Sequence, residues 1–254
     1  MLDRFNRFIE KWMAFVTPLC LLTGVCFPDI AKHGLPYVTY VFAFMTFAGA
    51  LKSRFRDVAN VLKNPTSLLI IMVMLHVVIP TTACGLGHLL FHDNMNLITG
   101  MVLEFSIPTA VASLMWISIF DGNSSLSLSL VVIDTILAPF SKLALMFVVT
   151  SNSSKVAPYI RNMNLQRVGV AATILCLAAG GYFLGWIIAR VTKQEQETTI
   201  SMVYGTGMRN ISTGAVIAAA YFPGEVMFPV MIGTLFQQIL AAISGKLLTR
   251  KEEK

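Results

Sequence analysis

Long apolar runs separated by short polar segments determine what this chain can fold into. Of its 254 residues, 56% are hydrophobic and only 13% are charged, and the mean hydropathy is +0.71. About 20 apolar residues cross the hydrocarbon layer of a bilayer, so such runs predict membrane-spanning helices. We expect an all-α integral membrane protein with about eight transmembrane helices, at Met13–Pro28, Tyr37–Leu51, Ser67–Leu90, Leu97–Phe120, Ser124–Thr150, Val168–Ala189, Thr198–Phe222 and Val226–Leu248.

The distribution of Lys and Arg among the loops predicts the orientation of these helices. Thirteen basic residues lie on one side, whereas the other side has only Lys32, Lys155, Arg161 and Arg167. The positive-inside rule then places both termini in the cytoplasm of a multi-pass cell-membrane protein. The net charge of +6 is explained by this orientation and by attraction to membrane lipid, so no nucleic-acid partner is expected. The four cysteines lack CxxC spacing, and no metal-dependent cofactor is expected.

Two predicted spans contain helix breaks at similar depth. Pro108 interrupts Leu97–Phe120 because it removes a backbone donor, and Gly205 and Gly207 loosen Thr198–Phe222. Two ordinary kinks are the simple alternative. Unwound backbone within a membrane must be buried in protein or line water, and paired interrupted helices are typical of transporter sites. The predicted substrate-binding residues are therefore the polar residues after the breaks: Thr109, Ser113, Arg209, Asn210 and Thr213.

Arg209 is the most costly residue to place in a membrane, at least about 2.5–3.5 kcal/mol, so it should face a polar cavity or an acid. Three other ionisable residues lie within predicted spans: His76, Glu104 and Asp134. An ion pair with Asp134 would reduce the cost of Arg209, or Arg209 could bind a carboxylate substrate through two hydrogen bonds. Protonation of the three residues could also couple transport to a proton gradient. Glu104 could instead lie at the membrane interface.

The order and separation of several short motifs resemble the bile acid:sodium symporter family. These motifs are Gly207–Asn210 followed by Ala218–Pro223 and Phe228–Pro229, Asp121–Asn123 through Ser127 to Leu137–Pro139, and Asp57–Pro65. The resemblance covers most of the chain. It implies a single transmembrane domain over residues 1–254, built from inverted repeats and divided into a core and a panel, with residues 97–120 and 198–222 crossing in the core. It also implies transport of an organic anion, bile-acid-like or a small carboxylate, by alternating access.

The chain is shorter than the ten-helix pattern of this family. Val131–Phe140 resembles the end of the fifth family helix and Lys142–Pro158 resembles the seventh, so about two helices are missing near Phe140–Ser141. Residues 141–167 then form the join and a non-cytoplasmic loop. The resulting unequal repeats favour two further hypotheses. One is a homo-oligomer that rebuilds the missing surface, and the other is an incomplete or regulatory family member that does not transport.

The resemblance also implies sodium sites, and this chain departs from them. The family has a Glu-x-Gly-Met-Gln-Asn run on the second crossing helix, where Gly205 and Arg209 here replace the glutamate and the glutamine. A lost carboxylate and a fixed positive charge disfavour a cation, so weak or absent sodium dependence is expected. Arg209 could itself stand where an ion would be. The residual sodium site comprises Ser113, Ser127 and Asn210, and the candidates for ion or proton coupling are Ser127, Asp134, His76, Glu104, Met208 and Thr206.

An intramembrane enzyme is the least favoured alternative. It would need a nucleophile and a base on converging helices, for which His76, Asp134 and a serine could be combined. Nothing in their spacing specifies such a site, so no enzymatic activity is expected.

Overall fold

The computed structural model describes residues 2–50, 65–107, 116–117, 120, 146–147 and 149–249. Within these residues every regular element is helical and no strand is present. The helices are α1 (Leu2–Cys26), α2 (Pro28–Ala31), α3 (Leu35–Ala50), α5 (Pro65–Val73), α6 (Ile79–Phe91), α7 (Met95–Ser106), α10 (Leu165–Val191), α11 (Gln196–Gly207), α12 (Ile211–Tyr221) and α13 (Met227–Thr249), together with residues 149–161. The predicted span Ser124–Thr150 and the site residues Thr109, Ser113, Ser127 and Asp134 lie outside the described residues, apart from a few at the end of that span.

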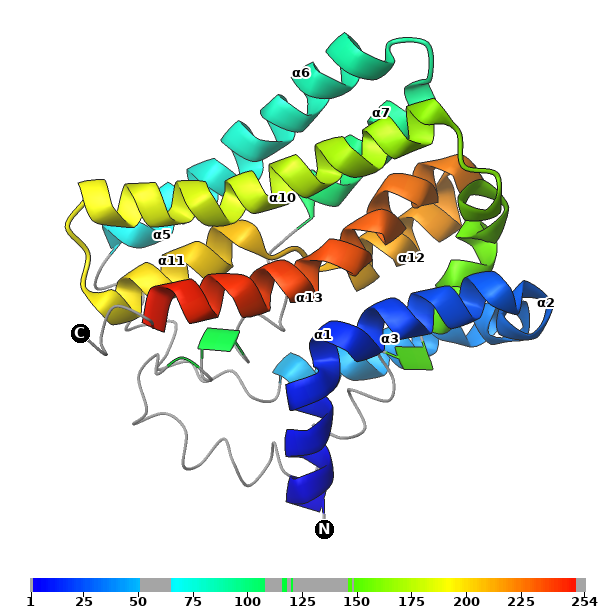
Figure 1. The fold of residues 1–254 in the computed structure, drawn as a ribbon, viewed down its shortest axis with the longest axis horizontal. Coiled ribbons are helices and arrows are strands. Elements are labelled where there is room, and N and C mark those ends of the chain that lie inside the picture. The colour runs from blue at the N-terminus through cyan, green and yellow to red at the C-terminus, as the bar shows by residue number, and fades with distance from the viewer. Residues whose placement is uncertain are drawn as a thin grey trace.

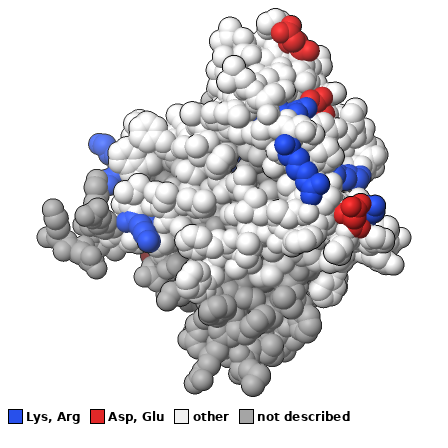
Figure 2. Space-filling view, turned by 45° about the vertical axis from the view of Figure 1, so that its right-hand side comes forward, with Lys and Arg blue, Asp and Glu red and all other residues white. Residues whose placement is uncertain are grey.

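Among the described residues, three continuous helical stretches are long and apolar enough to cross a membrane: Leu69–Phe91, Leu165–Val191 and Gly224–Thr249. Phe15–Cys26 and Pro28–Phe44 together satisfy the same criterion but are bent by 98° at the break between them. The first stretch contains the π-helical turn η2 (Met74–Val78), which joins α5 to α6. On the described part of the face in Figure 2, charged side chains lie toward the two ends and leave an uncharged band between them. This distribution fits a protein surrounded by lipid.

Helix α13 organises the core. It packs against α1, α7, α10 and α12, and Figure 1 shows it crossing the middle of the molecule. Its first turns are fully buried, with Phe228 and Met231 at 0% and 1% exposure, and they meet Leu97 and Met101 of α7. The residues at the centre of the molecule therefore come from helices that are far apart in the sequence.

Small residues bring α10 and α11 into close contact. A β-carbon at Gly185 would lie 2.1 Å from Oγ1 of Thr206 and 2.9 Å from the Met202 carbonyl, and one at Gly181 would lie 2.9 Å from the Thr206 carbonyl. A small residue at each of two positions four apart allows two membrane helices to approach closely. The Thr206 hydroxyl uses this proximity and donates to the carbonyls of Gly181 (3.0 Å) and Met202 (2.8 Å).

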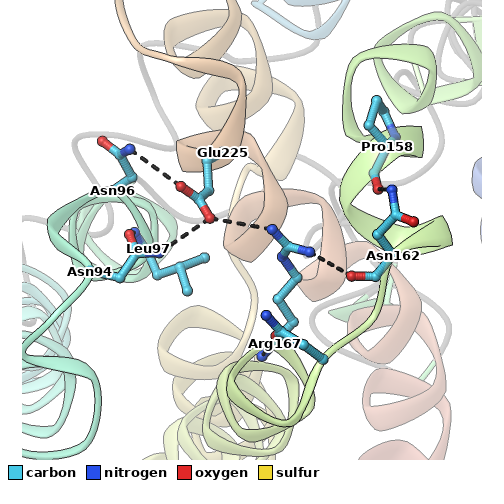
Figure 3. A network of polar contacts seen from close by, with 8 residues as sticks. Asn94, Asn96, Leu97, Pro158, Asn162, Arg167 and Glu225 are labelled. Carbon is cyan, nitrogen blue, oxygen red and sulfur yellow. Dashed lines mark hydrogen bonds and ion pairs between the residues drawn. The ribbon is translucent and has the colours of Figure 1, made fainter.

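A polar network joins three turns at one end of the bundle (Figure 3). Glu225, in the 3-10 turn η4 (Gly224–Val226), accepts hydrogen bonds from Asn94 (3.2 Å) and Asn96 (3.3 Å) and lies 3.6 Å from a guanidinium nitrogen of Arg167. The guanidinium of Arg167 also lies 5.3 Å from the centre of the Tyr159 ring. The network fixes the start of α7, the start of α10 and the turn before α13 relative to one another. Because α2 lies at the same end in Figure 1, we call it the α2 end.

Candidate functional site

The second predicted break is a short stretch of non-helical backbone between α11 and α12. Helix α11 ends at Gly207, and Met208 has extended backbone angles (φ −94°, ψ 142°). Asn210 then caps α12, because its side-chain oxygen accepts a hydrogen bond from the Thr213 backbone N–H (3.4 Å). The break therefore comprises residues 208–210 and places Arg209 between two half-helices.

Gly207 is required next to this break because α10 packs closely against the end of α11. Its β-carbon, if present, would lie 2.5 Å from the ring of Tyr182 on α10. No glycine among the described residues has a positive φ, so Gly207 is needed for close approach and not for a left-handed backbone. Gly205 lies within α11, and a β-carbon there would meet Ile71 at an ordinary 3.5 Å.

The first predicted break lies beside the second. Helix α7 ends at Ser106, and Ile107 is extended with ψ 145°. This conformation is the one favoured before a proline, and the following residue, Pro108, lies outside the described residues. The side chain of Ile107 occupies the space where a β-carbon of Gly214 on α12 would be. The end of α7 and the first turns of α12 are therefore in direct contact.

Arg209 is buried, with 3% of its surface exposed. Its Nη1 donates to the carbonyls of Thr206 (2.9 Å) and Met208 (3.1 Å), and its backbone N–H donates to the side-chain oxygen of Gln237 (2.7 Å). The last carbonyls of a helix lack partners within the helix and carry the negative end of its dipole. A guanidinium therefore occupies the position at the end of α11 where a bound cation would be stabilised.

Glu104 is a second ionisable side chain buried near this site. It is 3% exposed on α7, and a β-carbon at Gly233 of α13 would lie 2.3 Å from its Oε1. Its carboxyl group interacts electrostatically with the guanidinium of Arg209. Glu104 is thus buried in the core and does not lie at an interface. Within the described residues, Oε2 of Glu104 and Nε of Arg209 are both buried without a hydrogen-bond partner.

Helix α13 contributes polar side chains that the sequence analysis missed. Besides Gln237, Gln238 accepts a hydrogen bond from the indole N–H of Trp116 (3.1 Å), and the buried hydroxyl of Thr234 has no partner among the described residues. The sequence predicts Val226–Leu248 as an apolar span without a polar face. Two adjacent glutamines in the middle of that span, Gln237 and Gln238, were the available indication of a polar face.

The break brings together Thr206, Met208, Arg209, Asn210 and Thr213. The backbone carbonyls of Thr206 and Met208, rather than their side chains, face the guanidinium. His76 is exposed on the π-helical turn. Of the residual sodium site only Asn210 is described, and its side-chain oxygen already caps α12.

Comparison with known proteins identifies the family. The model of the Sodium Bile acid symporter family matches residues 39–221. The chain belongs to this family. It is 34% identical, over 300 aligned positions, to the uncharacterized protein YbaS of Bacillus subtilis (strain 168), covering 95% of this chain and 98% of YbaS. It is 21% identical, over 308 positions, to the uncharacterized sodium-dependent transporter YocS of the same strain, covering 100% of this chain and 96% of YocS.

The two alignments show that this symporter-family chain is shorter than its relatives. The alignment with YocS spans 308 positions but contains at most the 254 residues of this chain, which leaves at least 54 positions without a counterpart. The alignment with YbaS spans 300 positions and uses 95% of this chain, about 241 residues, so about 59 positions are unmatched. The expected position of the shortage, Phe140–Ser141, lies outside the described residues.

Proposed function

We propose that this chain is a secondary transporter of a small organic anion in which Arg209 takes the place of a bound sodium ion. The observation that carries the proposal is the pair of hydrogen bonds from Nη1 of Arg209 to the carbonyls of Thr206 and Met208. Membership of a symporter family and the description of YocS as a sodium-dependent transporter support the transport function. Sodium coupling is the part of the family's function that we expect this chain to have lost.

Electrostatics gives the expected size of this effect. A fixed charge about 5 Å from a second cation repels it by about 3 kcal/mol at an effective dielectric constant near 20. That repulsion lowers sodium affinity by about two orders of magnitude, because each 1.4 kcal/mol is a factor of ten. Glu104 interacts electrostatically with Arg209, and among the described residues no ion pair joins the two side chains. A further cation would therefore enter a site that already holds the positive charge of Arg209.

The same residues suit an anionic substrate. Nη1 of Arg209 points to the end of α11, whereas its Nε has no partner among the described residues and could donate to a carboxylate. The N-terminus of α12 adds partial positive charge at the break. We assign Asn210 and Thr213, with Thr109 and Ser113, to the substrate site, and Glu104 to charge compensation or proton coupling.

We further propose the family architecture for this shorter chain. Residues 97–120 and 198–222 form the crossing helices of the core within one domain of about eight spans in inverted repeats, and residues 141–167 form the join. Both termini face the cytoplasm. Substrate is released when the core moves against the panel.

Sodium-dependent stabilisation of the purified chain tests the proposal. Thermal unfolding is measured in sodium chloride and in choline chloride for wild type, for Arg209→Gln, and for Gly205→Glu/Arg209→Gln, which restores the family run. A β-carbon at position 205 meets only ordinary contacts. We expect no sodium effect in wild type and sodium stabilisation in the double variant. The control, Arg190→Gln, removes an exposed guanidinium and should behave as wild type. A sodium effect in wild type equal to that in the double variant would refute the surrogate-cation role.

The missing 54 to 59 positions favour a second candidate, a family member that does not transport. Reconstituted vesicles separate the two candidates. A transporter gives saturable counterflow of a labelled carboxylate that Arg209→Gln reduces, whereas a non-transporting member binds the carboxylate without counterflow.

A further inference from the structure

A second buried polar site lies between residues 149–161 and α12, apart from the site at Arg209. Asn152 is 1% exposed, and within the described part of the chain neither its Oδ1 nor its Nδ2 has a hydrogen-bond partner. Buried amide groups in folded proteins are almost always paired. Because neither amide atom of Asn152 is paired, we infer that the side chain pairs with a bound molecule.

One face of these helical turns packs tightly against the N-terminal helices. A β-carbon at Gly24 of α1 would meet the Thr150 carbonyl and the Ser153 β-carbon. A β-carbon at Gly34, in the 3-10 turn η1 (Lys32–Gly34), would meet the hydroxyl of Ser151. This face has no room for a ligand.

The opposite face carries Asn152. Residues 152, 155 and 159 recur every three to four positions and therefore share a face of the helix. On that face Nζ of Lys155 donates to the Ala219 carbonyl of α12 (3.0 Å), and the Tyr159 ring lies next to Gly224. Asn152 lies on the same face about one turn, or 5 Å, from Lys155. Figure 1 shows these green turns between α12 and the blue N-terminal helices.

Lys155 adds a charge that a ligand could neutralise. The lysine is partly buried, and among the described residues it forms no ion pair with a carboxylate; its ammonium group donates to the neutral carbonyl of Ala219. An ammonium group has three donors and can accommodate a carboxylate as well as the carbonyl. The face thus combines a partly buried positive charge with an amide that lacks both a donor and an acceptor.

We propose that Asn152 and Lys155 bind a short hydroxy carboxylate at the α2 end of the bundle. The carboxylate pairs with Lys155. A carboxylate oxygen also accepts from Nδ2 of Asn152, and the hydroxyl group donates to its Oδ1, which a plain carboxylate cannot do. The proposal specifies the substrate class of the proposed transporter, although binding at this site does not require that transport occur.

Ligand-induced stabilisation of the full chain in detergent tests the site, with propionate, lactate and glycerate as probes. In wild type, lactate and glycerate should bind at least tenfold more tightly than propionate. Asn152→Leu, which removes both unpaired atoms at similar volume, should abolish that preference and keep propionate binding. Lys155→Gln should weaken all three probes about tenfold, whereas Lys155→Arg should retain them. Lys32→Gln, at an exposed lysine that pairs with Asp29 (2.8 Å), is the matched control and should change nothing.

A purely structural Asn152 predicts a different result. Asn152→Leu would then unfold at the same or a higher temperature and leave the probe preference unchanged, which would overturn the proposal. Equal stabilisation of wild type by lactate and propionate would overturn it as well. If Asn152→Leu does not accumulate, Asn152→Ala tests the same preference. The proposal for Arg209 is tested separately, because it fails if sodium stabilises wild type against unfolding. The substitutions at Asn152 and Lys155 do not change the outcome of that sodium measurement.

Discussion

The buried charges of Glu104 and Arg209 give the sharpest stability prediction. Arg209→Gln removes the two hydrogen bonds from the guanidinium to the buried carbonyls of Thr206 and Met208, together with its electrostatic interaction with Glu104. By comparison with the loss of one member of a buried polar or charged pair, we expect a cost of about 3–5 kcal/mol. For a chain of this length each kcal/mol lowers the unfolding midpoint by about 2–4 °C, so we expect a decrease of about 6–20 °C.

The double variant Glu104→Gln/Arg209→Gln should recover part of this loss, because it leaves no isolated charge. We expect a coupling free energy of about 1–3 kcal/mol between the two positions. The measurement is a double-mutant cycle: the unfolding midpoints of wild type, the two single variants and the double variant are compared in one detergent at fixed pH and salt. Arg190→Gln, which removes an exposed guanidinium, controls for loss of charge alone. Single effects that add to the double effect within about 0.5 kcal/mol would show that the two residues do not act as a pair.

Four further outcomes are expected. Gly185→Ala should lower the unfolding midpoint by the equivalent of about 1–3 kcal/mol because it overpacks α11, whereas Gly180→Ala, with open space, should not. Glu225→Gln should cost at most about 1 kcal/mol, since its ion pair is partly solvated. Lys32 lowers the pKa of Asp29, so any stability difference between wild type and Asp29→Asn should be present above the ordinary pKa and disappear on acidification. Native mass measurement should give a dimer if a partner rebuilds the missing surface.

The helix break at Arg209 could be predicted because its chemistry is local. Gly205 and Gly207 in an apolar run predict non-helical backbone close to them, and the structure has that backbone at residues 208–210. The reason for Gly207 could not be predicted. Its contact with Tyr182 depends on how α10 packs against α11, which no local pattern determines.

Which ionisable residue lies near Arg209 could likewise not be predicted from the sequence. The sequence offered Asp134, Glu104 and His76 as ionisable residues at membrane depth. Only the packing of α7 on α13 shows that Glu104 is buried beside Gly233, and Asp134 lies outside the described residues. The orientation of Asn152 is also a tertiary property, since it follows from the contacts of Lys155 and Tyr159 with residues some 65 positions away.

A guanidinium that is covalently part of the carrier has a consequence for the direction of transport. A dissociable sodium ion moves with its substrate and adds its own gradient to the driving force, whereas in the proposed transporter Arg209 would return with the protein in every cycle. A monovalent anion carried alone then follows its own gradient and the membrane potential. At 100 mV, inside negative, the potential contributes about 2.3 kcal/mol per charge, or about 50-fold in favour of the outside. A carrier of this design would release an anion from the cell more readily than it would accumulate one.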